Sequence, residues 1–204
     1  MDIWKFVRNY TFSSPERHIS LLVEEAIKLK KNGGNEVLDI VGGLRNRRSD
    51  LEKLGECTTL DIKKYPWVDV VGDAEETPFN DKRFNIVAAF MILEHLKNPD
   101  KAIREFYRVL KPEGLVLLTT VQYWHTHGYP NDYFRYTKEG LKYLLENAGF
   151  KIKKIWSMGG PFLVVFHAIE LNLSPLPRKF FLLLSPLFNF LDKFFFNHND
   201  KRKE

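Results

Sequence analysis

The sequence contains a single cysteine among 204 residues, which excludes a disulfide framework and a cysteine-rich zinc site. Its first residues mix charged and aromatic side chains, without the apolar run of a secretory signal peptide. Both absences favour a reducing, cytoplasmic location. A strong excess of one sign of charge is also missing, because 31 Lys and Arg against 26 Asp and Glu leave a net charge of +5. This weak basicity does not indicate nucleic acid as a partner.

Long apolar runs are missing as well. The uncharged stretch from Phe180 to Leu191 has 12 residues and contains Pro186. A membrane-spanning helix needs about 20 apolar residues, so we expect none. Phenylalanine, in contrast, is abundant in the C-terminal part, where nine of the 17 lie after Met158. This change in composition predicts an N-terminal arm and helix (1–34), a core domain (35–158) and an apolar, aromatic-rich extension (159–204).

The central part of the chain alternates between two hydrophobic patterns. Helical spacing of apolar residues predicts one helix from Ser13–Pro15 to Gly33–Gly34, one from Asn98–Pro99 to Lys111, and one from Thr137 to Gly149. Short apolar runs between them predict six buried strands, at residues 36–40, 57–62, 68–73, 84–90, 115–121 and 150–156. This alternation predicts an α/β fold with a Rossmann-like, doubly wound, mostly parallel sheet.

Ligands of such sheets bind beyond the carboxyl ends of the strands, so the residues that follow each strand are candidates for chemistry. Gly42 and Gly43 form a turn that lets a ligand approach the backbone. Asp61 follows the second strand, where a carboxylate can accept hydrogen bonds from both hydroxyls of a ribose. Asp73 follows the third strand and His95 the fourth. Each has a simpler alternative: a tight turn, a surface Asp at a strand end, or a histidine at a helix start.

The order of these segments is more specific than any one of them. The stretches EVLDIVGG, TTLDI, GDAEETPF, EHL, RVLKPEG and YTKEGLKYLLENAGF occur in this order between residues 36 and 156. The chain thereby resembles the class I S-adenosylmethionine-dependent methyltransferases, in particular the group related to ubiquinone and menaquinone C-methyltransferases (methyltransferase type 11). A nicotinamide-dinucleotide site fits less well, because G-x-G-x-x-G is absent after the first strand.

The resemblance implies S-adenosyl-L-methionine as cofactor. It places the methionine part against Asp39, Gly42 and Gly43, and the ribose on Asp61. The adenine would lie against Ile62, Asp73 and Ala74, with Phe90, Met91 and Glu94 under the methionyl end. In this family the Asp is usually followed by Gly-x-Gly-x-Gly, whereas this chain has Val41 and Arg45 at the first and third glycines. An alternative is therefore a non-catalytic binding module that keeps the fold with a degenerate cofactor turn.

The segment 122–136 is long, aromatic and rich in titratable groups, which suits an acceptor site. Transfer to a hydroxyl needs a base, and His125, His127 or Asp132 could supply it. The alternative is an internal polar network of His127, Asp132 and Arg135 that holds the loop. The remaining histidines are scattered along the sequence, so we expect no metal site.

Beyond the core, residues 162–173 favour a helix over the antiparallel last strand usual in this fold. Residues 177–197 could close the acceptor site, form a dimer surface, or lie in a membrane interface near basic side chains. The predicted function is methyl transfer to an oxygen or carbon of a small or lipid-linked acceptor.

Overall fold

The computed structural model describes residues 15–29, 34–41, 48–127, 131–155, 160–172 and 178–195. The chain divides into two compact units. One contains residues His18–Trp156, and the other combines Met1–Arg17 with Ser157–Glu204. The three-part division expected from the sequence stays a prediction, and the N-terminal arm lies outside the described residues.

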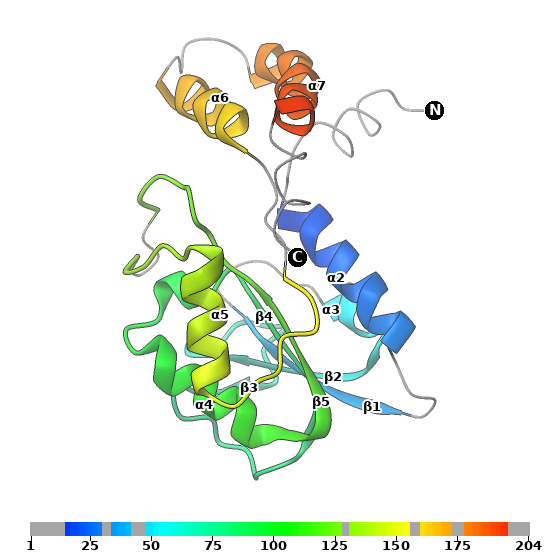
Figure 1. Cartoon of the computed structure of the whole chain (residues 1–204). Helices are drawn as coiled ribbons and strands as arrows, with labels where there is room; N and C mark the ends of the chain where they lie inside the picture. The colour runs from blue at the N-terminus through cyan, green and yellow to red at the C-terminus, as the bar shows by residue number, and fades with distance from the viewer. Residues whose placement is uncertain are drawn as a thin grey trace. The chain divides into compact units, whose positions relative to one another are not determined.

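The larger unit is built on a sheet in which all described strands are parallel (Figure 1). The strands are β1 Asn35–Ile40, β2 Gly55–Asp61, β3 Val70–Val71, β4 Phe84–Phe90 and β5 Leu110–Thr119. Their order is β3-β2-β1-β4-β5, so the chain winds outward from β1 in one direction and then returns to continue in the other. The predicted α/β class with a doubly wound parallel sheet is confirmed.

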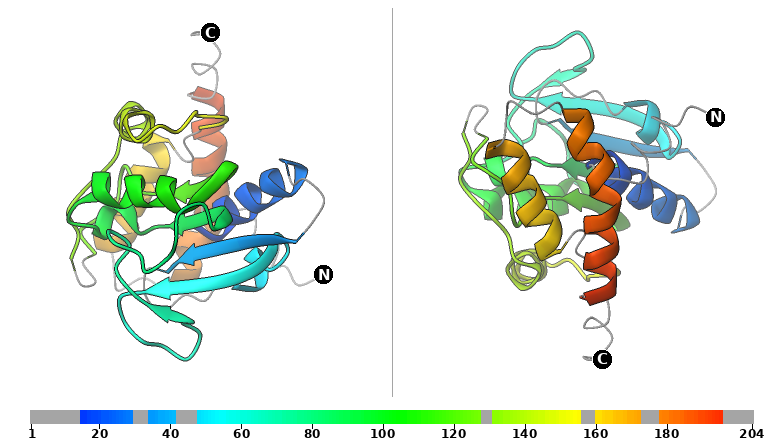
Figure 2. Two further views of the ribbon diagram at one scale, coloured as in Figure 1. Left: turned by 90° about the horizontal axis from the view of Figure 1, so that it is seen from below. Right: turned by 90° about the horizontal axis from the view of Figure 1, so that it is seen from above.

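Helices cover both faces of this sheet (Figures 1 and 2). They are α2 Pro15–Leu29 and α3 Arg48–Leu51 on one face, and α4 Pro99–Val109 and α5 Lys138–Asn147 on the other. Successive residues of β1 serve the two cores: Leu38 packs in the cluster that contains Phe106 of α4, whereas Val37 packs in the cluster that contains Val23 of α2. This alternation requires a strand with both faces buried, and the last four residues of β1 are all buried.

Two helices begin where the sequence predicts. Thr137 caps α5, because its hydroxyl accepts a hydrogen bond from the Gly140 N–H at 3.0 Å. Pro99 lies at the start of α4, as expected from its preset backbone angle. The residues predicted to cap the first helix and to end it, Ser13 and Gly33–Gly34, include positions outside the described residues.

The sixth predicted strand, at residues 150–156, is wrong: residues 150–155 have no strand structure. Phe150 and Ile152 are half-buried against the core, while the lysines between and after them are exposed. Alternate side chains of this segment therefore pack against the core, although its backbone does not pair with a strand. Two further strands have different lengths from those expected, since β5 begins at Leu110 rather than 115 and β3 is only Val70–Val71.

The second unit contains α6 Pro161–Asn172 and α7 Arg178–Phe195, which lie side by side (Figures 1 and 2). The buried Asp192 carboxylate of α7 accepts hydrogen bonds from the N–H groups of Gly160 (2.9 Å) and Phe162 (3.0 Å). It thereby satisfies backbone donors at the start of α6. The helix predicted from Phe162 is confirmed. None of the described helices combines the length and apolar character that crossing a bilayer requires.

Candidate functional site

The carboxyl ends of the parallel strands meet at one edge of the sheet, and Asp39 and Asp61 lie there. Asp39 is 3% exposed and pairs in register with Thr59 of β2 and Ala88 of β4. Beyond β1, the N–H of Val41 donates to the Leu60 carbonyl at 2.8 Å, which extends the ladder by one residue. The edge between β1 and β4 is the point where the winding direction reverses, the usual position of a ligand in this architecture.

Asp61 ends β2 and is 4% exposed. Its Oδ1 accepts a hydrogen bond from the Lys63 N–H at 2.8 Å, which fixes the direction of the carboxylate. The next residue, Ile62, is 64% exposed, unusual for a large apolar side chain beside a buried acid. This pair offers a polar contact and an apolar surface at one place, a combination that suits a nucleoside.

The loop after β3 carries Asp73 and Ala74, and its shape is set by hydrogen bonds. Asp73 Oδ1 accepts from the Glu75 N–H at 2.8 Å, and Ala74 is buried. Glu75 in turn accepts from the backbone N–H and the side-chain amide of Asn98, both at 2.8 Å. Burial alone would raise the pKa of Glu75, but these hydrogen bonds outweigh it and lower the pKa. The loop is therefore tied to the start of α4.

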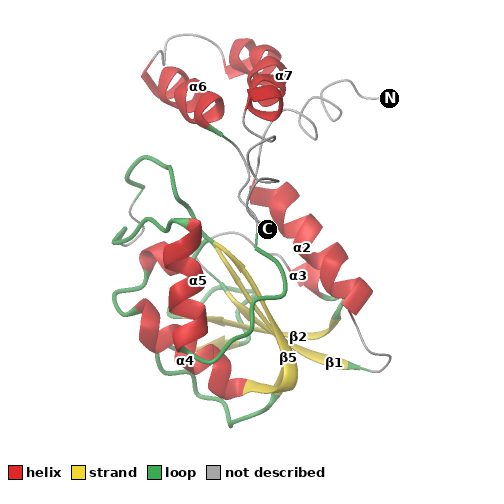
Figure 3. Cartoon of the chain, in the orientation of Figure 1, coloured by secondary structure: helices red, strands yellow, loops and turns green. Residues whose placement is uncertain are grey.

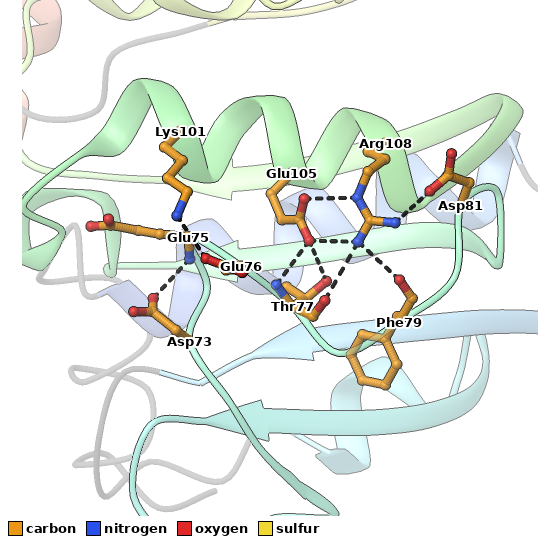
Figure 4. Close-up of polar contacts among 9 residues, drawn as sticks. All are labelled: Asp73, Glu75, Glu76, Thr77, Phe79, Asp81, Lys101, Glu105 and Arg108. Atoms are coloured by element: carbon orange, nitrogen blue, oxygen red, sulfur yellow. Dashed lines mark hydrogen bonds and ion pairs between the residues drawn. The ribbon is translucent and has the colours of Figure 1, made fainter.

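A second anchor holds the same loop farther along (Figure 4). Glu105 of α4 accepts from both the N–H and the hydroxyl of Thr77, each at 2.8 Å. Arg108 donates to Glu105 through Nε (2.8 Å) and Nη2 (2.6 Å), to the Phe79 carbonyl (2.9 Å) and to Asp81. The hydrogen bond from Arg108 holds the pKa of Glu105 below its ordinary value. Arg108 of the RVLKPEG segment thus helps to hold the GDAEETPF segment in place.

Phe90 is the last residue of β4, and Met91 follows it. Phe90 is buried, and Met91 adopts a left-handed backbone conformation with φ of 54°. The Met91 N–H donates to the carbonyl of Thr119 (2.9 Å) and to its hydroxyl (3.2 Å), so neighbouring β5 holds the turn. A left-handed conformation at a residue other than glycine is uncommon and costs energy, and such strain is concentrated at functional sites.

A long loop connects β5 to α5 (Figure 3). Among its described residues, hydrogen bonds from side chains hold it in place. Arg135 donates through Nη2 to Asp132 Oδ2 at 2.7 Å and through Nη1 to Asp132 Oδ1. Arg135 also donates to the Trp124 (3.2 Å) and His125 (3.1 Å) carbonyls, and the His127 N–H donates to Asp132 at 2.9 Å. The hydrogen bond from Arg135 lowers the pKa of Asp132, so this carboxylate is a weak base.

The predicted histidines occupy different environments. His125 is exposed, whereas His127 is partly buried, with its ring centroid 5.0 Å from that of His95. His95 belongs to the single-turn helix η1 Leu93–His95 that follows β4, next to the buried Glu94. His95 is thus next to His127 in space, although the two are 32 residues apart in the sequence. Because β4 and β5 are neighbours, the segments that follow them meet.

The sequence did not identify Glu105 and Arg108 as part of this site, because they are nearly 30 residues away in the chain from the loop that they hold. A usable signal existed, because Arg108 lies in the RVLKPEG segment that the family resemblance already singled out. Gly42 and Gly43, predicted to line the methionine part of the cofactor, and Arg45 lie outside the described residues.

Residues 42–118 match the family model described as a methyltransferase domain. Together with the doubly wound sheet, this match over residues 42–118 confirms the resemblance to class I S-adenosylmethionine-dependent methyltransferases.

The curated proteins that this chain resembles include methyltransferases. The ubiquinone/menaquinone biosynthesis C-methyltransferase UbiE of Neisseria meningitidis serogroup C is 36% identical over 110 residues, 44% of this chain and 43% of the relative. The protein of the same name from Psychromonas ingrahamii is 30% identical over 105 residues, 42% of each chain. The chain thus spans less than half the length of these curated relatives.

Solved structures with the same fold include a SAM-dependent methyltransferase from Aquifex aeolicus (19% identity, TM-score 0.52, covering 78% of this chain and 93% of that one). Another is the Burkholderia thailandensis 1,6-didemethyltoxoflavin-N1-methyltransferase, solved with S-adenosylhomocysteine (18% identity, TM-score 0.52, 72% and 69% covered). The [4+2]-cyclase SpnF is also similar (19% identity, TM-score 0.57, 88% and 76% covered). At these identities the likeness shows the fold alone.

Proposed function

We propose that this protein transfers the methyl group of S-adenosyl-L-methionine to an oxygen or carbon of a small or lipid-linked acceptor. The observation that carries the proposal is the pair of buried carboxylates, Asp39 and Asp61, at the edge where the sheet reverses its winding. The names of the curated relatives and the S-adenosylhomocysteine in the Burkholderia structure support it.

The residues at this edge fit such a cofactor. Asp61 would accept hydrogen bonds from the ribose hydroxyls, and exposed Ile62 would cover one face of the adenine. Asp73 and Ala74, held in place through α4, would meet the adenine edge. The methionine part would extend past Asp39 and the Gly42–Gly43 turn. Phe90 and Met91 would close the pocket at the methyl end.

The bound cofactor supplies an electrophilic methyl group, so the protein's main task is to align the acceptor with it. Transfer forms a bond from the acceptor to the methyl carbon as the carbon–sulfur bond breaks, and its electron pair stays on sulfur. A hydroxyl acceptor also loses its proton. We propose His127 or His125 as the group that takes it, with Asp132 orienting His127 rather than acting as the base itself.

The helices α6 and α7 support a peripheral contact. Among the side chains described on these helices, exposed large apolar ones are Val164, Val165, Ile169, Leu184, Leu187, Phe190, Phe194 and Phe195. We propose that this surface lies against an anionic membrane face on the cytoplasmic side, with a second copy of the chain as the alternative.

The decisive experiment is calorimetric titration of the full chain with S-adenosylmethionine and S-adenosylhomocysteine. Binding that Asp61→Ala weakens supports the proposed cofactor site. Absence of binding would favour the alternative, a non-catalytic module that retains the fold. Methyl transfer from labelled cofactor to quinol and phenol acceptors then separates the enzyme from a protein that only binds the cofactor.

A further inference from the structure

Three potential metal ligands converge at the carboxyl ends of β4 and β5. One ligand atom each from Glu94, His95 and His127 lies within 4.8 Å of the other two. Glu94 and His95 are adjacent in η1, whereas His127 comes from the loop that follows β5. Backbone hydrogen bonds hold the two segments together, since the Tyr133 N–H donates to the Glu94 carbonyl at 2.8 Å. The convergence is therefore a feature of the fold.

One oxygen of the Glu94 carboxylate lacks a hydrogen-bond partner among the described residues. The Glu94 side chain is fully buried, with 0% exposure. Its Oε2 accepts a hydrogen bond from the Thr120 hydroxyl at 2.9 Å, but its buried Oε1 has no hydrogen-bond partner among the described residues. A buried carboxylate oxygen without a donor is costly, and a coordinated cation would remove that cost.

Each of the two histidines contacts a backbone carbonyl through Nδ1. His95 Nδ1 lies 2.6 Å from the Asn131 carbonyl, and His127 Nδ1 lies 3.1 Å from the His125 carbonyl. Because a carbonyl oxygen can only accept, each contact favours a proton on Nδ1, which in the neutral ring leaves the Nε2 lone pair for a metal ion. Metal-bound histidines are typically oriented in this way, through the nitrogen that does not bind the ion.

We infer that Glu94, His95 and His127 form a binding site for a divalent transition-metal ion, with Zn²⁺ and Fe²⁺ as the best-matched ions. Two imidazoles and one carboxylate are borderline ligands that suit these ions better than Mg²⁺ or Ca²⁺. Three protein ligands also leave coordination positions open, the pattern of catalytic rather than structural sites. Asp132, 3.3 Å from His127 Nδ1 and itself held by Arg135, would orient this ligand.

The site has a consequence that rests on the proposed function. A bound ion with an open position could hold a hydroxyl oxygen of the acceptor and lower its pKa. The oxygen would then attack the methyl group as the alkoxide or phenolate, with its proton passing to exposed His125 or to water. In this arrangement His127 serves as a ligand instead of a base, and the enzyme would act on oxygen rather than carbon.

The test is a titration of the chelator-treated full chain with Co²⁺, followed by visible absorption and by competition with Zn²⁺. We expect stoichiometric binding with the d–d bands of a coordinated site. Glu94→Gln and His127→Ala should each weaken the affinity by at least about ten-fold, because losing a direct ligand should cost no less than losing a residue that only orients one. The matched control is His125→Ala, two residues away on the same loop, which should bind Co²⁺ like the unaltered chain.

Absence of stoichiometric Co²⁺ binding would overturn the inference, and so would an equal loss of affinity in His125→Ala. If Glu94→Gln does not fold, as judged by circular dichroism, His127→Ala on the loop decides the question. Titrating the same samples with S-adenosylmethionine separates the two proposals. A chain that binds the cofactor but no ion disproves only the metal site, and one that binds the ion but no cofactor disproves only the proposed function.

Discussion

Arg108 provides the sharpest test of how α4 supports the loop after β3, which carries Asp73 and Ala74. Arg108→Met would keep much of the aliphatic stem and helix propensity but remove every hydrogen bond that the guanidinium donates. The bonds to Glu105 matter most, because the Glu105 side chain is only 13% exposed. The contact with Asp81 matters little, because that side chain is 68% exposed.

The magnitude follows from these partners. Losing a bidentate, charge-assisted pair with a largely buried carboxylate costs about 1.5–2 kcal/mol after discounting for the exposed side of Arg108. Leaving the Phe79 carbonyl without its donor adds about 0.5–1 kcal/mol. We therefore expect Arg108→Met to lower the free energy of unfolding by roughly 2–3 kcal/mol, and to weaken cofactor binding because the loop carrying Asp73 and Ala74 loses an anchor.

The same pair predicts a dependence on pH. The pKa of Glu105 is lowered in the folded protein from an ordinary value of 4.5. Its ionised form therefore stabilises the fold fully above pH 4.5, and this contribution is lost as the pH falls through the lower folded value. Arg108→Met should flatten this acid loss, because the hydrogen bond that contributes most to the shift is gone.

The assay is urea denaturation followed by circular dichroism between neutral and acidic pH, with Asp81→Asn as the matched control. Asp81→Asn should change the free energy of unfolding by no more than about 0.5 kcal/mol, since it alters an exposed partner. The reasoning is refuted if Arg108→Met costs no more than Asp81→Asn, or if its stability falls with acid as steeply as that of the unaltered chain.

Three further predictions test the site and the extension. Asp61→Ala should weaken cofactor binding by about 1–3 kcal/mol in calorimetry because it removes the charged acceptor for the ribose, and unchanged affinity would place the cofactor elsewhere. Val41→Gly should lower the free energy of unfolding, measured by urea denaturation, by about 2–3 kcal/mol, because Val41 is buried and does not have a positive φ that glycine would relax. Unchanged stability together with tighter cofactor binding would contradict this. Truncation after Leu173 should leave cofactor binding intact but abolish sedimentation with anionic vesicles at low salt, a result that fails if the full chain never sediments with them.

The sequence by itself determined the architecture of the core, because strand and helix patterns are local. A buried strand such as β4 is visible as an apolar run, and the start of α5 is visible as Thr137 before apolar residues at helical spacing. Asp39 and Asp61 could be assigned to one edge because parallel strands bring their carboxyl ends together. The same local reasoning failed at residues 150–155, where an alternating pattern lies on the core without pairing.

Contacts between distant segments were decided only by the tertiary structure. Arg108 reaches the Phe79 carbonyl across 29 residues of sequence, because α4 packs along the loop after β3. His95 meets His127 only because β5 lies beside β4, so that the two following segments share one edge. Periodicity and composition report which face of an element is buried, but not which elements become neighbours. The order of strands in the sheet therefore determines which polar side chains meet, and with them the chemistry of the site.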